Sequence, residues 1–112
     1  FFNERDSGSG SLYNYSPGFN RKKTVSCITL TDIIKTNKIG KCDFLKMDCE
    51  GAEEQILLKT PPELLSRIKS ITMEWHTGLN KLSIEEFKRF LTGFGFSTDF
   101  NSATSILYAR KE

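Results

Sequence analysis

The segment KMDCEGAEEQ, residues 46 to 55, places four carboxylates within ten residues. They are Asp48, Glu50, Glu53 and Glu54. Carboxylates at this spacing can accept a proton, attract a cation or hold a metal ion. The apolar run at 43 to 47 directly precedes them, and such a run is typical of a buried strand. The acids therefore belong either to a charged helix start or to the rim of an active site.

The elements around these acids predict where they lie. The run at 43 to 47 is too short for a helix and predicts a strand buried on both faces. A second strand is predicted at 71 to 75. Sequential parallel strands are usually neighbours, and ligands bind beyond their carboxyl ends. We therefore expect the polar residues at these two strand ends to share one edge of the sheet, here called the rim. These residues are Asp48, Glu50, Glu74 and His76.

The four acids of this segment fall into two pairs, one explained by helix formation and one that indicates a functional site. Glu53 and Glu54 fall in the first turn of the next helix, where the helix dipole favours an acid by about 0.3–1 kcal/mol. Asp48 and Glu50 lie at a strand end, where they repel each other unless a cation or a proton offsets the repulsion. Gly51 allows a tight turn or a close approach of the backbone to a ligand. Asp48 and Glu50 are therefore the stronger functional candidates.

The other predicted elements complete an α/β fold. We predict a strand at 24 to 28, helices beginning near Leu30, Ala52, Pro62 and Ile84, and a terminal hairpin of strands at 94 to 100 and 104 to 110. Ser83 and Glu86 match a capping box, and Thr29 with Asp32 is a second N-cap candidate. Alternating strands and helices predict a parallel sheet with helices on both faces, closed by an antiparallel hairpin at or near one edge.

Residues 1 to 23 differ in composition from the rest. Residues 3 to 20 are rich in Ser, Gly and Asn, which favours turns and buries little surface. We expect a flexible arm or loose hairpin at 1 to 23, with a short strand at 12 to 15, and one folded unit at 24 to 112. The chain begins with Phe1 and not with Met, as expected of a piece of a longer polypeptide.

Bulk properties exclude several classes of protein. The net charge of +2 is too small to predict binding to nucleic acid or to a membrane surface. No apolar run approaches the ~20 residues that span a bilayer. Cys27, Cys42 and Cys49 are odd in number and contain no C-x-x-C pair, which argues against a disulfide framework or a structural zinc site. Reduced cysteines in a reducing compartment, the cytoplasm, are expected.

Three motifs together resemble the C-terminal half of FkbM-type methyltransferases. They are VSCITLTDII at 25 to 34, DFLKMDCEGAE at 43 to 53 and MEWH at 73 to 76. The central motif is long and specific, and the other two support it. Thr31 stands where the family usually has Asp. The resemblance covers about residues 24 to 110.

The resemblance implies a partial Rossmann-like class I methyltransferase fold with S-adenosylmethionine as the methyl donor. It implies O-methylation of a hydroxyl on a sugar, lipid or polyketide-like acceptor. The implied catalytic residues are Asp48, Glu50 and His76; Asp48 and Gly51 would bind the cofactor; Lys46, Glu53 and Glu74 would bind the substrate.

The family's glycine-rich donor loop after a first strand is missing from this sequence. Gly8 to Gly10 follow no apolar strand, and Gly93 to Gly95 end a helix, so both are expected to be turns or caps. We therefore expect the chain alone to be inactive.

Two other functions remain open at this stage. Asp48, Glu50 and His76 could hold Mg²⁺ or Mn²⁺, because oxygen and imidazole ligands gather at one strand end. Alternatively, the chain could be a truncated module that binds a partner or forms a homo-oligomer through an exposed sheet edge.

Overall fold

A four-stranded sheet organises residues 24 to 112 in this computed structural model, which describes residues 1–3 and 6–112. The strands are β3 (Leu45–Met47), β4 (Ser70–Glu74), β5 (Ser97–Asn101) and β6 (Ile106–Arg110), in the spatial order β3-β4-β6-β5. β3 and β4 are parallel, and Lys46 lies opposite Thr72. The predicted neighbourhood of these two strands is therefore confirmed.

The sheet is mixed and not parallel throughout. β6 runs antiparallel to both β4 and β5, and it lies between them. The predicted hairpin is confirmed, because a short turn joins β5 to β6; the Asn101 side chain accepts hydrogen bonds from the backbone N–H groups of Ala103 and Thr104 in that turn. β3 and β4 are the one adjacent parallel pair in the described part of the chain.

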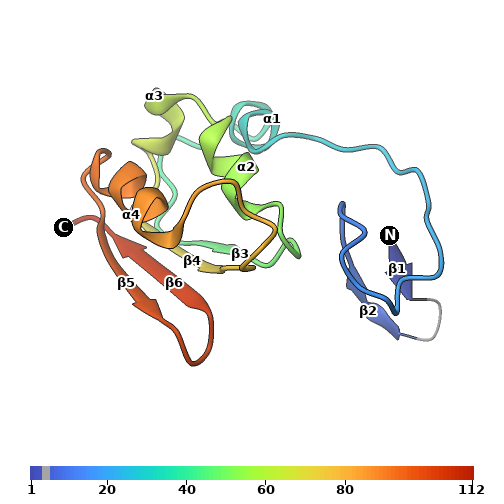
Figure 1. Cartoon of the computed structure of the whole chain (residues 1–112). Coiled ribbons are helices and arrows are strands. Elements are labelled where there is room, and N and C mark those ends of the chain that lie inside the picture. Colours follow the sequence, from blue (N-terminus) through green and yellow to red (C-terminus); the bar gives the residue numbers. More distant parts are fainter. Residues whose placement is uncertain (4–5) are drawn as a thin grey trace.

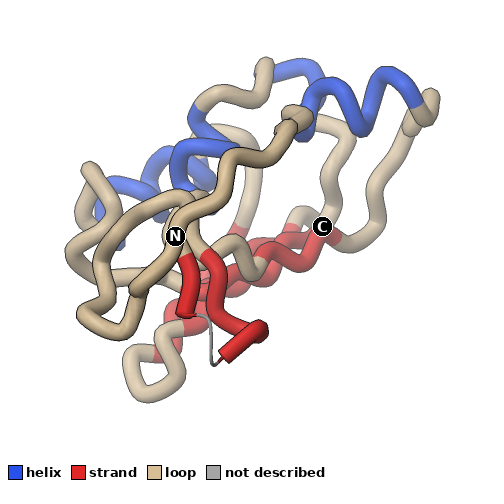
Figure 2. The backbone as a smooth tube through the Cα atoms, turned by 90° about the vertical axis from the view of Figure 1, so that its right-hand side faces the viewer, coloured by secondary structure: helices blue, strands red, loops and turns tan. Residues whose placement is uncertain are grey.

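The described helices cover one face of this sheet (Figures 1 and 2). They are α1 (Leu30–Thr36), α2 (Glu53–Leu58), α3 (Pro62–Leu65) and α4 (Ile84–Thr92). Both predicted N-caps are confirmed: Thr29 and Asp32 form a capping box at α1, and Ser83 and Glu86 form one at α4. Gly93 ends α4 as its C-cap, as predicted.

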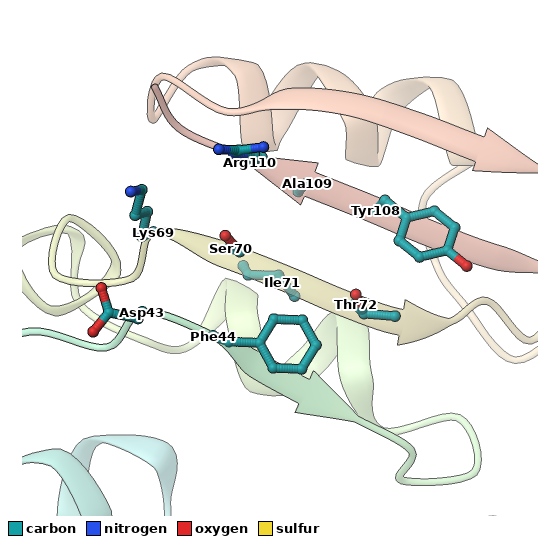
Figure 3. A pocket seen from close by; sticks show the side chains of 9 residues that line it. All are labelled: Asp43, Phe44, Lys69, Ser70, Ile71, Thr72, Tyr108, Ala109 and Arg110. Carbon is teal, nitrogen blue, oxygen red and sulfur yellow. The ribbon is translucent and has the colours of Figure 1, made fainter.

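The prediction of helices on both faces is wrong for the described residues. Figure 3 shows the other face, where Phe44, Thr72 and Tyr108 point away from the helices. Phe44 is 60% exposed and Tyr108 is 48% exposed, whereas the alternate residues Ile71 and Met73 of β4 are buried under the helices. This alternation with period two is typical of a sheet with one covered face. The run at 43 to 47 is therefore not buried on both faces.

The strand predicted at 24 to 28 is also wrong. These residues have no regular structure, and Val25 and Ile28 are 60% and 72% exposed. β-branched side chains favour a strand only where a neighbouring strand and a packed face are available. The segment has neither among the described residues.

Residues 1 to 23 contain a small sheet of their own. β1 (Phe2–Asn3) pairs antiparallel with β2 (Asp6–Gly10). The strand predicted at 12 to 15 is wrong, because these residues form no strand. Gly8 and Gly10 were expected in a turn or cap, yet they lie within β2.

The core lies between the sheet and the helices. It combines alternate residues of the strands with the inner faces of α2, α3 and α4. Its fully buried members include Leu57, Leu65, Ile68, Ile71, Met73, Phe87, Leu91 and Leu107. Trp75 and Phe87 are in contact, with ring centroids 5.1 Å apart.

The packing of α4 generates a first prediction. Phe87 is fully buried, whereas Phe90 is only partly buried against the core. Phe87→Ala should lower the free energy of unfolding by about 3–5 kcal/mol, and Phe90→Ala by clearly less. Urea unfolding followed by the fluorescence of Trp75 measures both. If Phe87→Ala does not fold, Phe87→Leu replaces it in the comparison; equal losses at positions 87 and 90 would contradict the assigned packing.

Candidate active site

The turn after β3 has an unusual backbone. Glu50 and Gly51 both have positive φ angles, +50° and +102°. A Cβ atom at Gly51 would lie 2.5 Å from Leu79 Cδ1 and 3.3 Å from Tyr13 Cδ2. Glycine is therefore required at position 51 by backbone conformation and by close packing. Glu50 adopts a conformation that non-glycine residues seldom use, and such strain is often found at functional sites.

The side chain of Glu53 holds this turn in place through hydrogen bonds. Its side chain is 1% exposed. Oε1 accepts a hydrogen bond from Cys49 N at 2.6 Å, and Oε2 accepts one from Gly51 N at 2.9 Å. Hydrogen bonds to an ionised group contribute about 1.5–3 kcal/mol each. Glu53, which was expected to bind substrate, thus has both oxygens on backbone groups of its own turn.

Glu54 fixes the loop that follows β4. Its side chain is also 1% exposed. Oε2 accepts from Lys81 N at 2.9 Å, and Oε1 accepts from Leu82 N at 2.7 Å. The favourable interaction with the helix dipole, about 0.3–1 kcal/mol, is smaller than the contribution of these two hydrogen bonds. The start of α2 therefore organises both loops at the rim.

His76 brings three of the predicted site residues together. Its Nε2 lies 3.3 Å from Glu50 Oε2 and 3.9 Å from Glu74 Oε2, and its Nδ1 lies 3.9 Å from Glu53 Oε2. The His76 side chain is 15% exposed, that of Glu50 is 27% exposed and that of Glu74 is 40% exposed. The cluster is thus partly buried and still open to a small molecule.

Tyr15 is a member of the site that sequence reasoning did not find. Its hydroxyl donates a hydrogen bond to Glu50 Oε2 at 2.8 Å, and its ring centroid lies 6.3 Å from that of His76. Ser11 Oγ donates to the Glu50 carbonyl oxygen at 2.6 Å. Residues 11 to 15 therefore lie against the turn at 49 to 51. No local signal marks Tyr15, because its partner lies 35 positions away.

Asp48 and Lys46 lie at the same rim but outside this cluster. Asp48 is at the carboxyl end of β3, and its Oδ2 lies 4.0 Å from Lys46 Nζ. Their side chains are 51% and 69% exposed. The pairing of Lys46 with Asp48 has a distance and an exposure at which such ion pairs are weak. Asp48 therefore faces solvent, whereas Glu50, Glu74 and His76 face one another.

Cys49 lies in the same turn but is a poor nucleophile. Desolvation, and then the nearby Glu53 carboxylate, raises the pKa of its thiol. A thiol with a raised pKa is protonated at neutral pH, and the thiolate is the reactive form.

Two hollows lie near the sheet. A groove of about 810 Å³ runs beside β3 and α2, and its lining includes Ile28, Ile33, Met47, Ala52 and Ile56. A shallower hollow of about 380 Å³ lies on the uncovered face of the sheet, between Phe44 and Tyr108, with Lys69 and Arg110 toward one end (Figure 3). The groove reaches the rim through Lys46, Cys49 and Leu79. In the described part of the chain, no helix has the length and apolar character needed to cross a membrane.

Comparison with protein families gives one match. The family model of the methyltransferase FkbM domain matches residues 1–98. The match includes residues 1 to 23, which lie outside the motifs that first suggested the resemblance. Neither a curated protein nor a solved structure matches the chain.

The contact between Tyr15 and Glu50 generates a second prediction. The hydrogen bond to Glu50 raises the pKa of Tyr15 from 10.0 to about 12. The folded chain holds this proton more tightly than the unfolded chain, so the stabilisation is present below pH 10 and is lost as the pH rises through about 12. An ultraviolet titration of phenolate absorbance, with Tyr15→Phe to identify the component, measures this. Glu50→Gln should return the pKa toward 10; an unchanged value would contradict the contact.

Proposed function

The chain belongs to the FkbM methyltransferase domain family, and on that premise we propose that its rim serves S-adenosylmethionine-dependent O-methylation. The acceptor is a hydroxyl on a sugar, lipid or polyketide-like molecule. One observation carries the proposal: Glu50 Oε2 and His76 Nε2 lie 3.3 Å apart, beyond the carboxyl ends of the two parallel strands. Ligands of open α/β sheets bind at that position.

The chemistry needs a proton acceptor and a way to orient the hydroxyl. S-adenosylmethionine supplies a methyl group on a positively charged sulfur. As the oxygen–methyl bond forms and the carbon–sulfur bond breaks, the hydroxyl proton passes to Glu50 or His76. The neighbouring carboxylate stabilises the resulting positive charge on the imidazole if His76 takes the proton. Both side chains are partly buried, which strengthens this electrostatic effect.

The other two rim residues, and Gly51 and Glu53 of the adjacent turn, have supporting roles in this proposal. Asp48 is exposed and negatively charged, which suits attraction of a cationic donor or the alternative role of base. Gly51 allows the backbone to approach a bound molecule closely. Glu74 contacts His76 and can accept a hydrogen bond from the acceptor. Glu53, with both oxygens engaged, positions the turn and does not contact substrate.

A second candidate function is association with another polypeptide. β3 has one partner strand among the described residues, and the side chains of Val25, Ile28 and Phe44 are 60% or more exposed. Unpaired strand edges and exposed apolar groups favour association. Binding of the methyl donor separates this function from the first.

The donor generates a third prediction. The 112-residue chain alone should bind S-adenosylmethionine with a dissociation constant above ~10 μM. The free energy of binding would then be weaker than about 7 kcal/mol. Gly8 and Gly10 lie within β2 and not between a strand and a helix, so the described residues offer no glycine-rich turn for the donor's carboxylate. Attraction by exposed acids is weak and screened by salt.

Nuclear magnetic resonance titration measures this affinity and locates the ligand. Amide shifts should change in residues 48 to 51 and 74 to 76, and Glu50→Gln should reduce them. Binding tighter than ~10 μM would show that a donor site had been missed. Shifts confined to the uncovered sheet face, or no shifts at millimolar donor, would favour the association module.

The reaction itself generates a fourth prediction. In the intact gene product, Glu50→Gln and His76→Asn should each lower kcat by about 10²–10⁴, the usual contribution of a general base. A donor with a deuterated methyl group and mass spectrometry of a panel of hydroxyl acceptors measure the product. Glu85→Gln is the control, because Glu85 is an exposed residue of α4 paired with Lys88. Transfer that is unaffected by both rim variants would overturn the assignment.

A further inference from the structure

We propose that Glu50, Glu74 and His76 form a binding site for a first-row divalent metal ion, with Mn²⁺ as the best match. The site differs from the sequence-based alternative, because Glu74 replaces Asp48 as the third ligand. One ligand atom from each of the three residues lies within 4.8 Å of the other two. Glu50 lies in the turn after β3, Glu74 ends β4 and His76 follows it. Separate buried carboxylates hold that turn and the loop after β4, so the arrangement does not follow from sequence adjacency alone.

The distances suit a shared ion. Two ligand atoms about 2.1 Å from one metal are about 3.0 Å apart when they are at right angles and about 4.2 Å apart when they are opposite. His76 Nε2 lies 3.3 Å from Glu50 Oε2 and 3.9 Å from Glu74 Oε2. Both values fall within that range. All three ligand atoms lie within 4.8 Å of one another, which is the only limit on the third pair, Glu50 and Glu74.

The charges suit a divalent cation. Among the described residues, the ion pairs of Glu50 and Glu74 involve His76 and no lysine or arginine. Two carboxylates that converge on one imidazole repel each other, and a dication would balance their charge. Two negative ligands, one neutral ligand and one dication give a site with no net charge.

The far side of the imidazole provides an independent observation. Ligation through Nε2 leaves the proton of a neutral histidine on Nδ1. Nδ1 of His76 is buried and has no hydrogen-bond partner among the described residues. It lies 3.9 Å from Oε2 of Glu53, a carboxylate that backbone hydrogen bonds hold in place. A metal-ligating histidine usually donates its second ring N–H to a carboxylate or a carbonyl group. Glu53 is the carboxylate beside Nδ1 here, at a distance slightly too long for a hydrogen bond.

The donor set selects the metal. Two carboxylates and one imidazole suit Mn²⁺ better than Mg²⁺, which keeps its waters and binds through oxygen. Zn²⁺ also accepts these ligands, but the thiols of Cys27, Cys42 and Cys49 would compete for it. Mn²⁺ is therefore the appropriate probe.

This inference goes beyond the proposed methyl transfer and is tested without it. A bound ion would occupy Nε2 of His76, so in the metal-bound state a hydroxyl would be activated by the ion and not by the imidazole. The test measures equilibrium binding to the chain with neither donor nor acceptor present. Its failure would thus leave the proposed transfer untouched, and a failed transfer assay would leave the metal site untouched.

The fifth prediction concerns Mn²⁺ affinity by isothermal titration calorimetry. The unmodified chain should bind one equivalent of Mn²⁺, and an equal concentration of Mg²⁺ should not displace it. Glu74→Gln and His76→Asn should each weaken binding at least about tenfold. Circular dichroism establishes that each variant remains folded, and His76→Gln replaces His76→Asn if the latter does not fold.

Two matched control variants distinguish a three-ligand metal site from general attraction of the cation by acids. Asp48→Asn removes the nearest rim acid outside the cluster, and Glu85→Gln removes a remote exposed acid. Both should retain Mn²⁺ affinity within about threefold. No saturable binding, or equal losses in Asp48→Asn and Glu74→Gln, would overturn the three-ligand site; the second result would indicate diffuse attraction by the rim acids.

Discussion

Two buried carboxylates at the start of α2 determine the shape of the rim. The Glu53 carboxylate accepts hydrogen bonds from backbone N–H groups of the turn after β3. The Glu54 carboxylate accepts hydrogen bonds from backbone N–H groups of the loop after β4. An ionised group with so little exposure is costly to bury unless its oxygens are hydrogen bonded. Each carboxylate here has two backbone donors. One short helix therefore couples the two loops that carry Glu50 and His76, so that a displacement of α2 would move both halves of the site.

The sheet explains why these loops meet. β3 and β4 are parallel and adjacent, so their carboxyl ends lie at one edge, and the residues that follow them are only one strand spacing apart. Antiparallel β6 continues the sheet on the other side of β4 without adding a carboxyl end to this edge. The carboxyl end of β5 lies at the same edge, but β6 separates it from β4, so the rim residues come from β3 and β4. The partial exposure of Glu50 and Glu74 follows from that limited enclosure.

Local signals predicted much of this fold. Both capping boxes, the terminal hairpin and the parallel pair could be recognised from spacing and residue type, because each depends on residues close in sequence or on a general rule of sheet topology. The strand predicted at 24 to 28 failed because strand formation depends on a partner that the local sequence does not specify. The prediction of helices on both faces was wrong for a similar reason. Alternation between strands and helices does not specify which face of the sheet each helix covers.

The site could be predicted only in part. The meeting of Glu50, Glu74 and His76 follows from the ends of two parallel strands, so position along the chain was sufficient. The burial of Glu53 and Glu54 was not evident, because acids in a first helical turn usually face solvent. Their role depends on where two loops turn, and this is a property of the three-dimensional fold. Tyr15 was missed because a contact across 35 positions leaves no pattern in either segment.

The backbone conformation and the side-chain contacts of the rim are combined at Glu50. Its backbone adopts φ of +50°, its carbonyl oxygen accepts from Ser11 Oγ, and its Oε2 lies within 3.3 Å of both Tyr15 Oη and His76 Nε2. The Tyr15 phenol donates its hydrogen bond to this carboxylate, and the His76 imidazole lies beside the same oxygen atom. A carboxylate held in this way is positioned to orient the imidazole of His76, to bind a cation or to take up a proton from a hydroxyl. The segment at 11 to 15 is therefore part of the structure that positions Glu50, together with the two strands.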